Sequence, residues 1–191
     1  ADLARKIAAS NTTWLVAGPV EGLDRCYSAP SLPPEFTVIA TDGSHIDVDR
    51  HKSTRCYLIN TGSAILHYGA SPEAVLDSFP SLYSEDKDLV LVSPATGGRE
   101  QAIEGVLLGV KRSVEECRRL SRLAAEIPGV SPALALLDGS LILWGLAGYP
   151  EFVSESLLVK GFLSSLNDIM KVNKSDRPLA LASYISFPRS T

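Results

Sequence analysis

Two Asp-Gly-Ser triplets, each at the end of an apolar run, are the residues of this sequence best suited to chemistry. The first lies in Thr41-Asp42-Gly43-Ser44-His45 and follows the apolar run 36–40, and the second, Asp138-Gly139-Ser140, follows the run 133–137. Carboxylate oxygens are the ligands that hard cations such as Mg²⁺ and Mn²⁺ prefer. Two acids at the ends of two buried strands therefore predict a divalent-metal site.

A simpler interpretation of these triplets remains open. Asp-Gly is a common turn, and the serines that follow are typical of residues that cap turns. For a single triplet the turn alone would be the more frequent explanation. Two copies, each preceded by a five-residue apolar run, make a coincidence less frequent and favour the metal site.

A third metal ligand is expected from the predicted long helix, residues 99–127. Glu115 shares a helix face with Lys111 and Arg118, which is typical of a solvated face. Glu116 lies beside Cys117, with small residues one and two turns before it, so its helix can approach the sheet closely. We therefore expect Glu116 rather than Glu115 at the site. The alternative is that both are surface acids paired with arginines.

Five cations give the same helix a basic side, and they are Lys111, Arg112, Arg118, Arg119 and Arg122. This side is suited to phosphates, although a solvated face with ion pairs inside the helix is an equally good interpretation. Among the histidines, only His45 is close in sequence to a candidate ligand, and His67 is expected to pack inside a strand. The candidate DNA contacts are His45, Lys111, Arg112 and Arg119.

The apolar patterns predict the elements that must position these residues. Strands are expected over 36–40, 55–60, 64–68, 133–137 and 179–185, and helices over 1–16, 99–127 and 154–172. A turn at 61–63 is expected to join the second and third strands as a hairpin, a polar connection covers 42–52, and Ser71-Pro72-Glu73 is typical of a helix start. This order predicts an α/β fold with a mixed sheet, in which three strands with a hairpin precede helix, strand, helix and strand.

Composition limits the class of protein. The chain has 191 residues, enough for one domain with a sizeable core, and its formal net charge of −4 argues against a dedicated basic clamp for nucleic acids. Cys26, Cys56 and Cys117 are far apart and show neither metal spacing nor a disulfide framework. These features, together with the lack of a long apolar segment, predict a cytoplasmic protein without a membrane anchor.

A resemblance to a known family enters through several segments. They are 40–51 around the first triplet, 57–62 (Tyr-Leu-Ile-Asn-Thr-Gly), 67–69 (His-Tyr-Gly), 136–142 around the second triplet, and 183–186 (Ser-Tyr-Ile-Ser). In this order they resemble the NurA nuclease family, from about residue 36 to the last residue. The resemblance implies an RNase H-like fold and places the catalytic, metal-binding acids at Asp42, Glu116 and Asp138.

The resemblance also implies an activity and its partners. It implies a Mn²⁺-dependent deoxyribonuclease (Mg²⁺ is possible) with 5′-to-3′ exonuclease and single-strand endonuclease modes, acting in DNA end resection with a hexameric HerA-type translocase. Two ions about 3.5–4 Å apart would assist phosphodiester hydrolysis. Residues 1–35 are expected to lead into a nuclease domain over 36–191, which is expected to continue into a further C-terminal part and to form a homodimer. The alternatives are a catalytically degenerate DNA-end-binding or assembly module and a purely structural domain of the same fold.

Overall fold

The computed structural model divides the chain into two compact units, residues 1–32 and 33–191. The residues that it describes are 2–9, 20–22, 24–47, 55–95, 98–128, 131–174 and 176–186. The first unit contains helix α1 (Asp2–Ala9). The sequence predicts a helix over 1–16, and its second half, from residue 10, lies outside the described residues.

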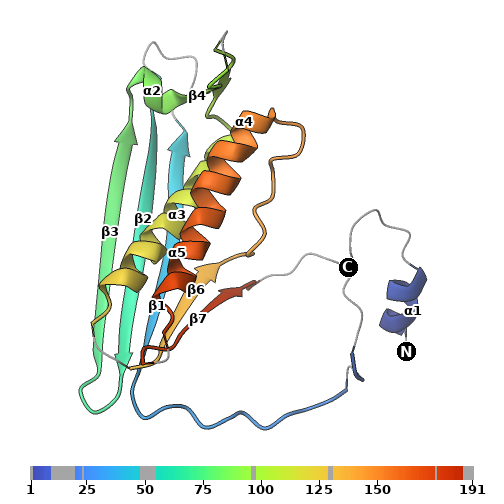
Figure 1. Ribbon diagram of the computed structural model, residues 1–191, viewed down its shortest axis with the longest axis vertical. Helices are drawn as coiled ribbons and strands as arrows, with labels where there is room; N and C mark the ends of the chain where they lie inside the picture. Colours follow the sequence, from blue (N-terminus) through green and yellow to red (C-terminus); the bar gives the residue numbers. More distant parts are fainter. Residues whose placement is uncertain are drawn as a thin grey trace. The chain divides into compact units, whose positions relative to one another are not determined.

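A five-stranded mixed sheet forms the centre of the second unit (Figure 1). Its strands are β1 (Phe36–Asp47), β2 (Tyr57–Tyr68), β3 (Glu73–Tyr83), β6 (Ala133–Asp138) and β7 (Leu179–Tyr184). They lie in the order β3-β2-β1-β6-β7, with antiparallel pairing from β3 to β1 and parallel pairing from β1 to β7. The predicted α/β class with a mixed sheet is therefore confirmed.

The predicted hairpin at residues 61–63 is wrong. Strand β2 runs without interruption through these residues, and Thr61 and Ser63 are buried within it, at 7% exposure each. Gly62 lies opposite Asp42 in the β1–β2 ladder. Residues that favour turns are tolerated here because the long neighbouring strands supply the ladder hydrogen bonds on both sides.

The predicted helix start at Ser71-Pro72-Glu73 is also wrong, because strand β3 begins at Glu73. Most of β3 is exposed, so it lacks the apolar alternation that identifies a strand in a sequence. Its Pro80 fits because β3 is an edge strand, where a missing N–H costs no ladder bond. The expected connection over 42–52 is likewise shorter, since β1 continues to Asp47 and residues 48–52 lie outside the described part.

Two long helical segments lie side by side over one face of the sheet (Figure 1). Helix α3 (Val106–Glu126) is followed after β6 by a continuous helical segment comprising α4 (Glu151–Ser154), the π-helix η1 (Glu155–Leu163) and α5 (Ser164–Val172). Gly161 allows their close contact, because a Cβ there would lie 2.7 Å from Cγ1 of Val114. The buried stripe of α3 includes the predicted Leu107, Val110, Val114, Cys117 and Ala124.

The long helix is shorter than the sequence predicts. Residues 99–105, expected to be helical, instead contain strand β5 (Glu100–Ala102), which pairs with β4 (Val90–Val92) in a separate two-stranded sheet. A one-turn helix, α2 (Asp86–Leu89), leads into β4. Gly105, with φ of +53°, immediately precedes α3 and ends the extended segment.

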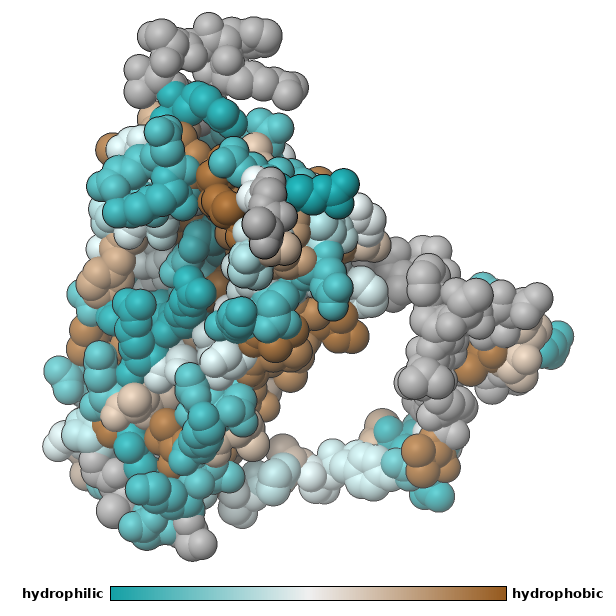
Figure 2. All heavy atoms as spheres, turned by 45° about the horizontal axis from the view of Figure 1, so that its top comes forward, coloured by the Kyte–Doolittle hydropathy of each residue, from teal (hydrophilic) through white to brown (hydrophobic). Residues whose placement is uncertain are grey.

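The two faces of the sheet differ in what covers them. Hydrophilic residues cover most of the helix side, with apolar patches between them (Figure 2). On the opposite face, strand alternation exposes apolar side chains that include Ile46, Leu76, Leu82 and Tyr184. Within the ranges given above, none of the helices combines the length and the apolar character needed to cross a membrane.

Candidate active site

Asp42 and Asp138 lie where the parallel pairing of β1 with β6 ends, Asp42 in the middle of the longer strand β1 and Asp138 at the last residue of β6. The β1–β6 register pairs Thr41 with Leu137, so the two aspartates follow at the same level of the sheet. Residues in register on adjacent strands point to the same face. The adjacency of the two triplet strands, which the metal-site hypothesis requires, is therefore present.

The residues just before the aspartates face the helices. Thr41 and Leu137 are each 3% exposed, and the hydroxyl of Thr41 donates a hydrogen bond to the backbone carbonyl of Glu116 on α3 at 3.0 Å. Because side chains alternate along a strand, Asp42 and Asp138 point to the opposite, open face, and both are exposed. Glu116 therefore approaches the strand ends from the other side of the sheet.

The two glycines of the triplets have different roles. Gly139 has φ of +100° and makes the turn that the sequence predicts after Asp138. Gly43 makes no turn, because it lies inside strand β1, so the turn-only interpretation is wrong for the first triplet. Its backbone N–H donates to the Asp42 carboxylate at 2.8 Å. The Asp42 side chain is thus held against its own strand.

Gly43 creates the space that Glu116 occupies. A Cβ at Gly43 would overlap the carboxylate oxygen Oε1 of Glu116, and it would lie 2.9 Å from Cγ of Glu116 and 3.1 Å from Cγ of Arg112. Only a residue without a side chain lets the helix place its carboxylate against β1 here. Sequence reasoning assigned Gly43 to a turn and missed that it makes room for Glu116. The crossing of α3 over β1 produces no pattern in the residues around Gly43, so the sequence could not reveal it.

The three acids border one hollow, which we call the strand-end cleft. It has a volume of about 420 Å³ and is lined by Asp42, Asp138 and Glu116, together with Arg112, Ser113, Ser140 and Trp144. Trp144 is 70% exposed, and the sequence analysis did not single it out. A tryptophan shortly after the second triplet in the sequence is the signal that could have identified it, because aromatic rings stack on bases.

The donor set fits a hard divalent cation in its chemistry. All three acids offer carboxylate oxygens, and Oε1 of Glu116 is buried without a hydrogen-bond partner among the described residues. The carboxylates are not assembled around one point, however. Among the residues that the structure describes, no three His, Cys, Asp or Glu side chains form a group that could hold a metal ion as they stand.

The three carboxylates of the cleft also affect one another's ionisation. Burial raises the pKa of Glu116 above its ordinary value, and the nearby Asp42 and Asp138 carboxylates raise it further. The Arg112 guanidinium and the backbone N–H of Gly43 act in the opposite direction. The negative charges of the three acids thus repel one another when no cation is bound, which makes ionisation of Glu116 less favourable.

Glu116→Gln should raise the melting temperature of the metal-free protein at neutral pH. A buried acid with a raised pKa costs stability once it ionises, so this cost is absent below the ordinary carboxyl pKa and grows as the pH rises. Each ~1 kcal/mol relieved corresponds to about 2–4 °C for a chain of this size. The measurement is thermal unfolding of both proteins with chelator from pH 4 to 8. An advantage for the variant that does not shrink towards pH 4 would contradict this assignment.

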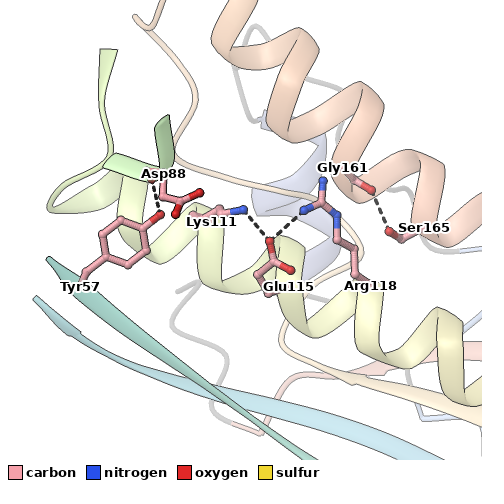
Figure 3. Close-up of polar contacts among 7 residues, drawn as sticks. All are labelled: Tyr57, Asp88, Lys111, Glu115, Arg118, Gly161 and Ser165. Carbon is pink, nitrogen blue, oxygen red and sulfur yellow. Dashed lines mark hydrogen bonds and ion pairs between the residues drawn. The ribbon is translucent and has the colours of Figure 1, made fainter. Parts of the chain in front are cut away.

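Glu115 lies away from the cleft, in an ion-pair network on α3 (Figure 3). Its Oε1 accepts hydrogen bonds from Lys111 at 2.5 Å and from Arg118 at 2.8 Å. Ion pairs inside the helix, one of the two interpretations that the sequence leaves open for the basic side, are therefore present here, and they occupy Lys111, one of the candidate DNA contacts. Figure 3 also shows Tyr57, whose hydroxyl donates to the backbone carbonyl of Asp88 at 2.7 Å on the β2 side of this network.

Two further candidate DNA contacts, Arg119 and His45, do not line the cleft either. Arg119 stacks over the ring of Phe79 on β3, with its guanidinium carbon 4.1 Å from the ring centroid. His45 lies three residues after Asp42 on β1, and its Nδ1 is buried without a hydrogen-bond partner among the described residues. His67 makes a cross-strand hydrogen bond with Thr37 at 2.8 Å, which confirms that it packs within the sheet. Of the four candidates, only Arg112 borders the three acids.

Comparison with known proteins connects this geometry to a family. The family model of the NurA domain matches residues 36–190, which is most of the chain. No curated protein sequence matches this chain.

Two solved structures of the prototype foamy virus protease–reverse transcriptase show a loose likeness. The native protein is 18% identical over 81% of this chain and 18% of the viral chain, with a TM-score of 0.34. A selenomethionine-labelled CSH mutant is 14% identical over 92% and 20%, with a TM-score of 0.38. This chain thus spans about a fifth of each viral chain, and the overlap is too loose to carry an argument.

Proposed function

This chain belongs to the NurA domain family, a nuclease family, and from that premise we propose that it hydrolyses DNA phosphodiester bonds with a divalent metal, Mn²⁺ or Mg²⁺. The observation that carries the proposal is the strand-end cleft, which three acids from β1, α3 and β6 border together. A metal-dependent phosphodiester hydrolase needs such a concentration of hard oxygen ligands, whereas a turn or a surface ion pair does not.

Each acid would have a defined part. Asp42 and Asp138, on the adjacent strands β1 and β6, would hold the cation from the open face of the sheet, and Glu116 would complete the ligand set from α3. When bound, the metal supplies Lewis-acid activation of the attacking water and stabilises charge on the leaving oxygen. The cation would also offset the repulsion among the three carboxylates.

The proposal extends to the fold and to the substrate. The sheet order β3-β2-β1-β6-β7, with only β2 antiparallel to the others, supports an RNase H-like assignment. At the cleft rim, the exposed ring of Trp144 would offer a stacking surface to a base of a single strand. This fits the proposed 5′-to-3′ exonuclease and single-strand endonuclease modes.

We also propose that the protein works with a hexameric HerA-type translocase in DNA end resection in the cytoplasm, as a homodimer. Along α3, which the structure describes throughout, Arg112 is the one basic residue that lines the cleft. Because non-specific affinity grows with the number of phosphates neutralised, a cleft with one cation would grip DNA weakly. A ring-shaped partner would supply the missing hold on the DNA and feed its end towards Asp42 and Asp138.

A cleavage assay on end-labelled single-stranded and duplex DNA tests the function. We expect cleavage with Mn²⁺, none with an excess of chelator, and recovery when Mn²⁺ is restored. Adding the translocase should increase the rate on duplex ends. Cleavage that persists in chelator would contradict a metal mechanism, and equal processive digestion without the translocase would contradict the proposed dependence on a partner.

A second candidate is a catalytically degenerate DNA-end-binding or assembly module. Two observations favour it: no metal-binding group of three side chains exists among the described residues, and Glu116 already has a cationic partner in Arg112. The same assay separates the candidates. The degenerate module would retain DNA in a gel-shift experiment without cleaving it under any metal condition.

A further inference from the structure

The ion pair between Arg112 and Glu116 has an unusual geometry. Nε of Arg112 lies 3.0 Å from Oε1 of Glu116, one helical turn away on α3. Both atoms are buried, yet neither makes a hydrogen bond of acceptable geometry with any described residue. The pair therefore has charge attraction without the aligned hydrogen bonds that make arginine–carboxylate pairs strong.

The two partners differ in their freedom to move. The side chain of Glu116 is 6% exposed and sits against the backbone of Gly43, whereas the side chain of Arg112 is 34% exposed. Glu116 is thus fixed in place at the cleft, and the guanidinium can leave towards solvent. The Arg112 guanidinium is therefore a cation that can be exchanged for another one at Oε1 of Glu116.

We propose that Arg112 is a positioning residue that holds the Glu116 carboxylate while no metal is bound and is displaced when a divalent cation takes that oxygen. The inference rests on the proposed function, because it requires the metal site. The guanidinium and the metal compete for Oε1, and a poorly aligned ion pair is the weaker competitor.

Displacement of Arg112 from Glu116 by a metal would leave a free positive charge beside the cleft. Without metal, Arg112 offsets part of the repulsion that Asp42 and Asp138 exert on Glu116. With metal, the released guanidinium remains beside the cleft as an unpaired cation. It is then free to contact a DNA phosphate, so that loading of the metal and attraction of the substrate are coupled.

The test is Mn²⁺ binding, measured by isothermal titration calorimetry. Arg112→Ala should bind Mn²⁺ about tenfold more tightly than the wild type, since the competitor is gone. Arg112→Lys keeps the charge and should stay nearer to the wild type. The matched control is Arg118→Ala, which removes an equal charge from the same helix but from Glu115, at 2.8 Å, rather than from Glu116.

Thermal unfolding gives an independent readout. Without metal, Arg112→Ala should melt at a lower temperature, because Glu116 loses its cation, and saturating Mn²⁺ should raise its melting temperature more than that of the wild type. Unchanged or weaker Mn²⁺ binding by Arg112→Ala, in a wild type that binds, would overturn the role of Arg112 alone. A wild type that binds no Mn²⁺ would overturn both this role and the proposed metal site.

Discussion

Asp42→Asn and Asp138→Asn should each lower the rate of Mn²⁺-dependent DNA cleavage by roughly 10²–10³-fold, the usual effect of removing one charged contact to a transition state. An amide has nearly the shape of the carboxylate but lacks its charge, so the loss reports on metal binding rather than on packing. Both side chains are exposed, Asp42 within β1 and Asp138 at the end of β6, and the fold should tolerate the change.

The same variants carry a second expectation for stability. Without metal, their melting temperatures should equal or exceed that of the wild type, because one of three neighbouring negative charges has been removed. Asp77→Asn on β3, an exposed aspartate of the same sheet outside the cleft, is the matched control and should cleave at the wild-type rate. Retained activity together with a clear loss of melting temperature would assign Asp42 and Asp138 a structural role instead.

Gly43→Ala should reduce cleavage on the order of 10²-fold, although it changes no charge. The new Cβ would occupy the position of the Glu116 carboxylate, so Glu116 must move away from the strand end. Displacements of about 1 Å in a catalytic group are sufficient for a loss of this size. Mn²⁺ affinity should fall in parallel, and cleavage kinetics with calorimetry would measure both.

Gly62→Ala provides the matched control for this substitution. Gly62 lies directly opposite Asp42 on β2, and a Cβ there would approach backbone oxygens of Asp42 at 3.5 Å and of Asp77 at 3.9 Å, which are ordinary contacts. We expect Gly62→Ala to cleave DNA at close to the wild-type rate. If Gly43→Ala were as active as Gly62→Ala, the position of Glu116 against β1 would be irrelevant to catalysis.

Local sequence patterns predicted the parts of the site that depend on a single element. The apolar runs before Asp42 and Asp138 predicted both strands, because buried parallel strands are apolar on both faces. Helical periodicity placed Glu116 on the side of α3 that meets the sheet and Glu115 among the basic residues. These inferences needed only the spacing of residues along one strand or one helix.

The parts that depend on contacts between elements were not predictable. Thr61-Gly62-Ser63 has the composition of a turn, and only the long ladders on both sides keep it extended within β2. Gly43 also has the sequence signature of a turn, and its real function depends on where α3 crosses β1. The Arg112–Glu116 pair was visible as an i,i+4 spacing, but its poor alignment and burial are properties of the folded site.

The most direct test of the metal site is an anomalous difference map from crystals soaked in Mn²⁺ and measured at the manganese absorption edge. We expect a peak in the strand-end cleft, at about 2.0–2.3 Å from carboxylate oxygens of Asp42, Asp138 and Glu116, with the Arg112 guanidinium moved away from Glu116. Manganese bound only elsewhere, with Arg112 still paired to Glu116 and the three carboxylates apart, would contradict it.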